Sequence, residues 1–149
     1  MGWYSVERSH ELAVGQVKPV QAFDRELVLY RTRSGRAVLQ DAFCPHLGAH
    51  LGYKGRVVGE SVRCPFHGWQ FGAEDGKCVK IPYFDEIPER AQLRTWHVEE
   101  KNGEVYMWFH PENTSPEWGL PNLPELGDPN WTAPRYTEHL VPAHVQDIC

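Results

Sequence analysis

Cysteine and histidine occur together in two short segments of this chain, at a spacing that suits a metal centre. The first segment is Cys44-Pro45-His46 and the second is Cys64-Pro65-Phe66-His67, with seventeen residues between them. Each segment offers one thiolate and one imidazole. Two sulfur and two nitrogen ligands are the set that a [2Fe–2S] centre takes when two His replace two Cys on one iron. The pattern therefore predicts a cluster with both thiolates on one iron and both imidazoles on the other. The candidate ligands are Cys44, His46, Cys64 and His67.

Two other interpretations of these four residues have to be weighed. A tetrahedral zinc site with two Cys and two His uses the same ligand types. Zinc fingers, however, usually pair Cys with Cys and His with His in a short unit, whereas each Cys here is paired with a His inside a much longer chain. Chance accounts poorly for two Cys-Pro units that each lead to a His. The pattern favours the cluster over a structural zinc-binding interaction module.

Residues around both segments are similar to those of a known family. The runs Cys44-Pro45-His46-Leu47-Gly48 and Cys64-Pro65-Phe66-His67-Gly68-Trp69 resemble the two cluster loops of Rieske proteins. The wider run from Gly59 to Tyr83 resembles the N-terminal domain of Rieske non-haem iron oxygenases, and within them the branch of ketosteroid hydroxylases and cholesterol desaturases. The resemblance covers about Gly2 to Pro111, and it implies one [2Fe–2S] cluster per chain.

The resemblance implies an electron-transfer role within a ring-hydroxylating type of oxygenase component. In that family the Rieske domain passes electrons from an NAD(P)H-dependent reductase or a ferredoxin to a mononuclear Fe(II) site. That site lies in the catalytic domain of the same or a neighbouring subunit. The parent protein is then expected to be an O2-dependent monooxygenase or dioxygenase with an apolar, steroid-like substrate, and a homo-oligomer, namely a trimer. The chain alone is not expected to be catalytic. A stand-alone Rieske ferredoxin is the alternative.

The C-terminal part of the chain separates these two interpretations. Ferredoxins that resemble Gly2–Pro111 end near there, whereas this chain continues and carries Trp118 and Trp131, which need a surface to pack on. In the oxygenases a stretch of Asn, Asp and two His follows the connector, and the mononuclear iron is bound by two His and one carboxylate. This chain stops at Gln146-Asp147-Ile148-Cys149, about where that stretch would begin. We therefore expect the mononuclear Fe(II) only in a catalytic domain that the chain lacks.

Residues after the second loop bear on the reduction potential of the cluster. In high-potential members of the wider superfamily a Ser and a Tyr donate hydrogen bonds to cluster sulfurs, and the matching positions here are Trp69 and Phe71. Phe71 has no donor, and Trp69 has an indole N–H in place of a hydroxyl. Because hydrogen bonds to sulfur stabilise the reduced cluster, we expect a potential low in the Rieske range of about −150 to +300 mV. The extra disulfide of some Rieske proteins is also absent, since its positions are Ala49 and Phe66.

Short apolar runs between turn signals predict the elements that hold the two loops. Turns are expected at Asp75-Gly76 and Asn102-Gly103, and the four Gly from Gly48 to Gly59 predict a loop. No run has a convincing helical period. The expected fold class is therefore all-β, an antiparallel sandwich or barrel of the Rieske type with an inserted cluster-binding subdomain, followed by a Pro-rich extension. Strands are expected at Trp3–Val6, Glu26–Arg31, Ala37–Gln40, Ser61–Arg63, Trp69–Phe71 and Val105–Phe109, with an edge strand or loop at Gly15–Val20.

The predicted domain division follows from the change in composition after Phe109. The Rieske domain is expected at residues 1–111, with cluster loops at 44–50 and 64–69, and a connector towards the catalytic domain at 112–149. Repeated proline in this part of the chain is typical of an extended segment that runs over a surface. The prolines are Pro111, Pro116, Pro121, Pro124, Pro129 and Pro134.

Composition restricts the partners and the compartment. The net charge of −5 argues against a nucleic acid as partner, and no apolar run is long enough for a bilayer, so no membrane partner is expected. Four Cys in a chain without a visible secretory signal are typical of a reducing compartment, here the cytoplasm. Cys78 is expected to be a small buried residue. His50 is expected near the first loop, at the surface of the cluster.

Overall fold

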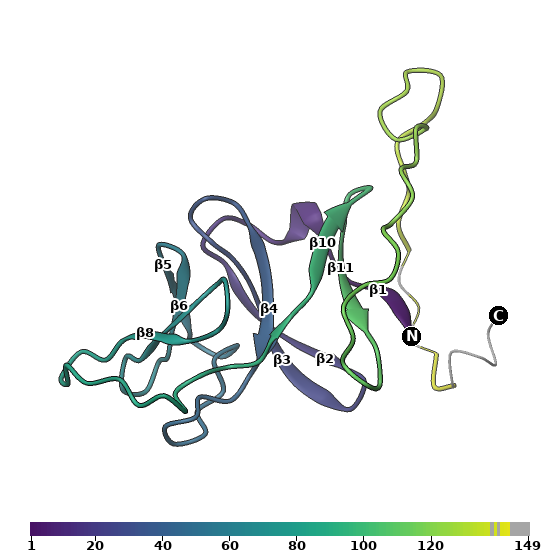
Figure 1. Cartoon of the computed structure of the whole chain (residues 1–149). Helices are drawn as coiled ribbons and strands as arrows, with labels where there is room; N and C mark the ends of the chain where they lie inside the picture. Colours follow the sequence, from purple (N-terminus) through teal and green to yellow (C-terminus); the bar gives the residue numbers. More distant parts are fainter. Residues whose placement is uncertain (138, 140, 144–149) are drawn as a thin grey trace.

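The structure, a computed structural model, describes residues 1–137, 139 and 141–143. The chain end at Gln146–Cys149, on which the expectation of a missing iron site depends, lies outside the described residues. Within them, one 3₁₀ turn, η1 (Ser9–Glu11), accompanies strands that pair antiparallel in three sheets (Figure 1). The predicted all-β class with antiparallel sheets is confirmed. In the described part of the chain, no helix is long and apolar enough to cross a membrane.

Two sheets form the body of the domain, and a third is inserted into it. The first sheet has the order β1-β11-β10, with β1 at Gly2–Arg8, β10 at Val98–Lys101 and β11 at Glu104–Phe109. The second has the order β2-β3-β4-β9, with β2 at Val17–Ala22, β3 at Arg25–Arg31, β4 at Ala37–Asp41 and β9 at Thr95–Trp96. The inserted sheet has the order β5-β6-β7-β8, with β5 at Arg56–Val58, β6 at Ser61–Arg63, β7 at Gln70–Gly72 and β8 at Cys78–Lys80.

The pairing of β4 with β9 closes the insertion. Leu39 pairs with Trp96 and Gln40 with Thr95, although all four strands of the inserted sheet come between β4 and β9 in the sequence. The inserted segment therefore leaves the body and returns to it at neighbouring strands. In Figure 1 its strands β5, β6 and β8 lie at the left, away from β1, β10 and β11 at the right. The predicted inserted subdomain is thus present as a separate sheet.

Strand β3 packs on both faces, which explains its uninterrupted apolar run Leu27-Val28-Leu29-Tyr30. Successive side chains of a strand point to opposite faces. Val28 and Tyr30 belong to a buried cluster that contains Cys44, Cys64 and Trp69, whereas Leu27 and Leu29 belong to a second cluster that contains Val105 and Met107. One strand thus separates the core beside the loops from the core of the body.

The predicted strands were found, with longer or shifted boundaries at several ends, and four strands, β5, β8, β9 and β10, were missed. The segment Gly48–Gly59 was expected to be loop, but its last part forms β5 and pairs with β6 around Gly59. Strands β5 and β8 have three residues each, too few for an alternating pattern to stand out, and sheet pairing stabilises them. The uncertain segment Gly15–Val20 contains the start of β2, which is an edge strand.

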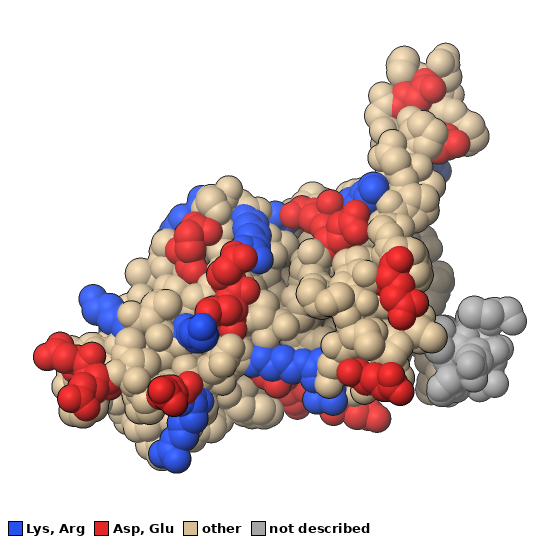
Figure 2. Space-filling model, viewed as in Figure 1, with Lys and Arg blue, Asp and Glu red and all other residues tan. Residues whose placement is uncertain are grey.

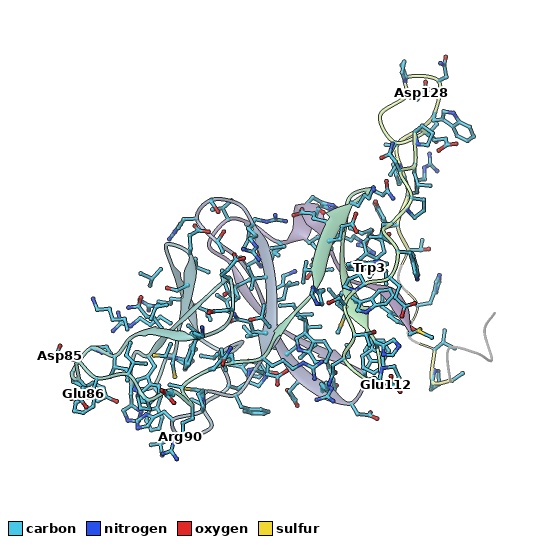
Figure 3. All side chains as sticks on the ribbon, viewed as in Figure 1. Trp3, Asp85, Glu86, Arg90, Glu112 and Asp128 are labelled. Atoms are coloured by element: carbon cyan, nitrogen blue, oxygen red, sulfur yellow. The ribbon has the colours of Figure 1, made fainter. Side chains whose placement is uncertain are left out.

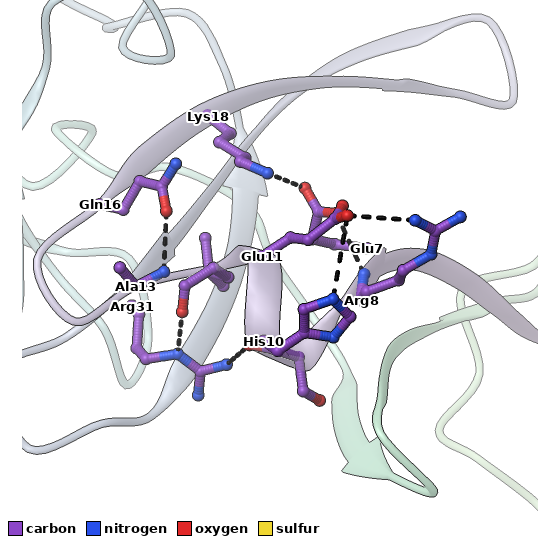
Figure 4. A network of polar contacts seen from close by, with 10 residues as sticks. Glu7, Arg8, His10, Glu11, Ala13, Gln16, Lys18 and Arg31 are labelled. Atoms are coloured by element: carbon purple, nitrogen blue, oxygen red, sulfur yellow. Dashed lines mark hydrogen bonds and ion pairs between the residues drawn. The ribbon is translucent and has the colours of Figure 1, made fainter. Parts of the chain in front are cut away.

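Polar contacts join η1 to the surrounding strands (Figure 4). Arg31 donates from Nε to the carbonyl oxygen of Leu12 at 2.6 Å, and its two terminal nitrogens form a bidentate pair with Glu100 at 2.7 and 2.8 Å. The remaining donors of the guanidinium reach the carbonyl oxygens of Ser9 and Gly35. Because Arg31 is almost fully buried, these partners satisfy a charge that would otherwise be costly to remove from water.

The segment after Phe109 first follows the body and then projects from it. Trp118 packs edge-to-face on Trp108 with ring centroids 5.7 Å apart, and its carbonyl oxygen accepts the indole N–H of Trp3 at 2.8 Å. Beyond this contact the chain forms an arm that stands away from the sheets, with Asp128 at its tip (Figures 1 and 3). Trp118 thus has the packing surface that its side chain needs. Trp131 is 63% exposed.

Candidate metal centre

Both candidate loops are closed by the same backbone hydrogen bonds. In the first, the N–H of Cys44 donates to the carbonyl oxygen of Ala49 at 2.9 Å, and the N–H of Gly48 donates back to Cys44 at 2.9 Å. In the second, the corresponding bonds run from Cys64 to Trp69 at 2.7 Å and from Gly68 to Cys64 at 3.2 Å.

Each loop needs glycine at the same place. Gly48 and Gly68 have φ angles of +72° and +77°, a region that residues with a Cβ atom rarely adopt. Each glycine is the fourth residue after its cysteine, so one loop design occurs twice. The histidine is the second residue after the cysteine in the first loop and the third in the second.

The loops bring the two thiols together in the interior. Cys44 and Cys64 are each 3% exposed. A hydrogen bond from the Cys44 thiol lowers the pKa of Cys64 to about 6, and backbone N–H groups of Phe66 and His67 act in the same direction. The same contact raises the pKa of Cys44. The Cys44–Cys64 contact therefore favours the thiolate form of Cys64, which is the form that binds metal.

The two candidate histidines also lie side by side. The rings of His46 and His67 have centroids 4.8 Å apart and meet edge to face at 72°. The Nδ1 atom of His46 is buried and has no hydrogen-bond partner among the described residues. Buried polar atoms are nearly always paired, so this nitrogen needs an explanation. Donation of its lone pair to a metal would supply one. This donor set fits a cluster that takes two thiolates and two imidazoles.

No group of three or more His, Cys, Asp or Glu in the described residues is arranged around a single metal position. A [2Fe–2S] cluster asks only two protein ligands of each iron, so a pair of thiols and a pair of rings is compatible with it. The four residues that the sequence predicts as ligands lie in these two pairs on the two loops, and their binding of a cluster stays a prediction.

Trp69 lies against His46 and does not offer its N–H to a sulfur. The indole and imidazole rings are stacked, with centroids 4.6 Å apart and 8° between their planes. The indole Nε1 donates to the phenol oxygen of Tyr83 at 2.9 Å. Phe71 is fully buried and has no polar atom. The indole N–H is thus taken by Tyr83 and Phe71 has no donor, so neither side chain would donate a hydrogen bond to a cluster sulfur; the low potential itself stays a prediction.

His50 is held by the protein through both ring nitrogens. Its Nδ1 accepts the backbone N–H of Gly52 at 3.0 Å, so its Nε2 carries the hydrogen and donates to the carboxylate of Glu26 at 3.1 Å. His50 therefore ties the first loop to the start of β3, and it is near the loop as expected. Cys78 is buried in the core beside the loops, and burial raises the pKa of its thiol, which confirms the expectation of a small buried residue.

An open pocket of about 610 Å³ lies beside the second loop. His67 and Phe66 line it, together with three cationic residues, and Tyr83 forms part of its wall. None of the three cations has an ion pair among the described residues. Asp85 and Glu86, the acidic residues that follow Tyr83 in the chain, lie at the far end of the inserted subdomain (Figure 3), where acidic side chains are seen at the left of Figure 2. The cations are Lys54, Arg56 and Arg63.

Sequence reasoning missed this cationic wall and the role of Tyr83. A signal for the wall was present, because all three cations lie in the segment that joins the two loops. Tyr83 had no such signal, since it is fourteen residues from Trp69 and only folding brings the two side chains together.

A family model for the Rieske [2Fe–2S] domain matches residues 2–97. Cholesterol 7-desaturase nvd of Xenopus laevis is 43% identical over 147 residues, covering 99% of this chain and 32% of the relative. A probable 3-ketosteroid-9-alpha-monooxygenase, oxygenase component, of Rhodococcus rhodochrous is 38% identical, covering 88% of this chain and 33% of the relative. The chain thus spans about a third of the length of these curated relatives.

Solved structures agree with this result. Apo dicamba monooxygenase superposes with a TM-score of 0.74 at 28% identity, over 85% of this chain and 39% of the other. The carbazole 1,9a-dioxygenase oxygenase in its reduced complex with ferredoxin gives a TM-score of 0.62 at 28% identity, over 71% of this chain and 28% of the other. Alignment with part of larger oxygenases favours the oxygenase interpretation over the stand-alone ferredoxin. Because the family model covers well over half of the chain, the protein belongs to the Rieske [2Fe–2S] domain family, in the form that occurs within Rieske oxygenases.

Proposed function

We propose that this chain is the electron-transfer domain of an oxygenase component, with a [2Fe–2S] cluster bound by two Cys and two His. The observation that carries the proposal is the repeated loop, which pairs two buried thiols and two imidazoles, one with an orphaned Nδ1. When bound, the cluster accepts and passes on one electron at a time. The proposed ligands are Cys44 and Cys64 for one iron and His46 and His67 for the other.

The proposed thiol ligands and the proposed imidazole ligands lie in different environments. The two thiol groups lie in a dry core with Val28 and Tyr30, which excludes water from the sulfur side. The imidazoles are only partly buried, and His67 lines an open pocket. A partner that fills this pocket would contact an iron ligand directly, so we propose His67 as the point where an electron enters or leaves.

The proposed electron donor is a ferredoxin or an NAD(P)H-dependent reductase with an acidic surface. Lys54, Arg56 and Arg63 attract such a surface across the pocket, and exposed Phe66 and Tyr83 add apolar contact area. The carbazole 1,9a-dioxygenase oxygenase, which has a similar fold, forms a complex with a ferredoxin. Three described cysteines are free thiols, in keeping with a reducing compartment such as the cytoplasm.

The parent protein is proposed to be an O2-dependent oxygenase that hydroxylates or desaturates an apolar sterol-like substrate. The relatives named cholesterol 7-desaturase and 3-ketosteroid-9-alpha-monooxygenase support this substrate class. A mononuclear Fe(II), held by two His and one carboxylate, belongs to a further catalytic domain in this proposal, and the parent is a homotrimer. The division into a domain at 1–111 and a connector at 112–149 is supported by the end of β11 at Phe109.

Metal analysis and spectroscopy of the purified chain test the cluster. Two irons and two acid-labile sulfides per chain are expected, with the visible absorption of an iron–sulfur protein. His67→Ala and Cys64→Ala should abolish the colour, whereas Cys78→Ala, which removes a buried thiol of the same core, should keep it. A colourless, zinc-loaded protein would contradict the proposal and support the zinc-binding module.

A further inference from the structure

The two cluster loops touch each other through a pair of stacked rings. His46 comes from the first loop and Trp69 from the end of the second, and their planes are 8° apart. No disulfide joins the loops, because the described cysteines are free. The stack is therefore a non-covalent tie between the loops, and it acts on one of the candidate ligands.

The plane of the indole is itself fixed from outside the loops. Trp69 is only 9% exposed, and its N–H donates to Tyr83, which follows β8 and is 60% exposed. The segment that carries Tyr83 is held in a turn by a bridge between Ile81 and Phe84. A hydrogen bond at the far end of the indole prevents the ring from rotating about its side-chain bonds, so three rings are linked in a row from the surface to the ligand.

Among the described residues, no ring anchored by a hydrogen bond stacks on His67. The ring centroids of His67 and Phe66 are 4.0 Å apart, with 38° between the ring planes, and Phe66 is itself 64% exposed. The phenyl ring has no polar atom that could fix it. The two imidazoles thus differ: His46 is stacked on an indole that a hydrogen bond fixes, whereas His67 lies beside the pocket.

We propose that Trp69 and Tyr83 are positioning residues that set the ring orientation of His46 on its iron, while His67 is left adjustable. The role rests on the cluster proposed above. Since the Trp69–Tyr83 hydrogen bond and the stack act in series, either partner's loss should disturb His46 in the same way. The orientation of an imidazole controls its overlap with the metal and is set by groups around the ligand.

Pulsed EPR of the reduced, 15N-histidine-labelled chain measures the two iron-bound nitrogens separately. Trp69→Phe keeps an aromatic ring but removes the N–H, and Tyr83→Phe removes only the acceptor oxygen. Each should broaden or shift one of the two nitrogen couplings and leave the other unchanged. The double variant should match the single variants, because both remove one hydrogen bond. Tyr53→Phe is the matched control, since Tyr53 is 59% exposed on the same subdomain and its hydroxyl has no hydrogen bond among the described residues.

A second measurement uses the release of iron to a chelator. Loss of one hydrogen bond of ordinary strength should speed release about fivefold in Trp69→Phe and in Tyr83→Phe, with no change in Tyr53→Phe. Couplings equal to wild type in both single variants, or additive effects in the double variant, would overturn the positioning role while leaving the cluster intact. If wild type itself gives no such EPR signal, both the cluster and the positioning role are wrong.

Discussion

The two buried cores on either side of β3 differ in the chemistry of their side chains. The core of the body, which contains Leu27, Leu29, Val105 and Met107, consists of apolar side chains that need nothing from outside the chain. The core beside the loops includes two thiols that would bind metal. One half of the domain can therefore form by hydrophobic burial alone, whereas the other half is expected to be complete only with its cluster.

The largest expected effect is the response to metal removal. After chelation, the amides of β5, β6, β7 and β8 should lose most of their protection against hydrogen exchange, whereas those of β1, β10 and β11 should keep theirs. The reason is that the ligand loops connect to the inserted sheet and not to the first one. Hydrogen exchange with mass spectrometry on the loaded and chelated chain measures this. Equal loss in both regions would show that the two cores form one cooperative unit.

A smaller effect is expected from a cavity in the body. Leu29→Ala removes a fully buried side chain and should lower the free energy of unfolding by about 2–5 kcal/mol. The ligand loops lie on the other side of β3, so the variant should bind the same amount of iron as wild type at low temperature. Chemical denaturation and iron analysis check the two halves of the prediction. Loss of iron without loss of stability would contradict the separation of the cores.

The smallest expected effect concerns the ion pair at the edge of the body. The hydrogen bond from Arg31 lowers the pKa of Glu100, so the stability that this carboxylate contributes is present above its unfolded pKa of about 4.3 and is lost as the pH falls through its lower folded pKa. Glu100→Gln should lower the free energy of unfolding by about 1 kcal/mol at pH 7. The effect is small because the carboxylate is 35% exposed and partly screened by solvent.

The difference in the free energy of unfolding between Glu100→Gln and wild type should become smaller as the pH falls below about 4. Unfolding curves at several pH values measure this difference. Glu99→Gln on the same strand serves as control, because the ion pair of Glu99 with Lys101 is longer, at 3.6 Å, and is not a bidentate pair with a buried arginine. A difference that stays constant down to pH 3 would show that Glu100 acts through packing and not through its charge.

Local signals predicted much of the fold and of the site. Asn102-Gly103 predicted the turn between β10 and β11, and the run at Leu27 predicted β3. The turn before β3 was not predicted, because Phe23 and Asp24 adopt positive φ without a glycine to signal it. The short strands β5 and β8 gave no pattern, since sheet pairing with distant residues stabilises them.

The amino-acid sequence alone determined which residues are proposed to bind the metal. Each ligand loop closes within six residues, through backbone bonds and a glycine whose position the sequence shows, so its chemistry is local. Tertiary structure alone decided what surrounds those ligands. The stack of Trp69 on His46, its bond to Tyr83 and the cationic pocket join segments of the insertion that the pairing of β5, β6, β7 and β8 brings together. Such contacts depend on sheet order and not on local spacing.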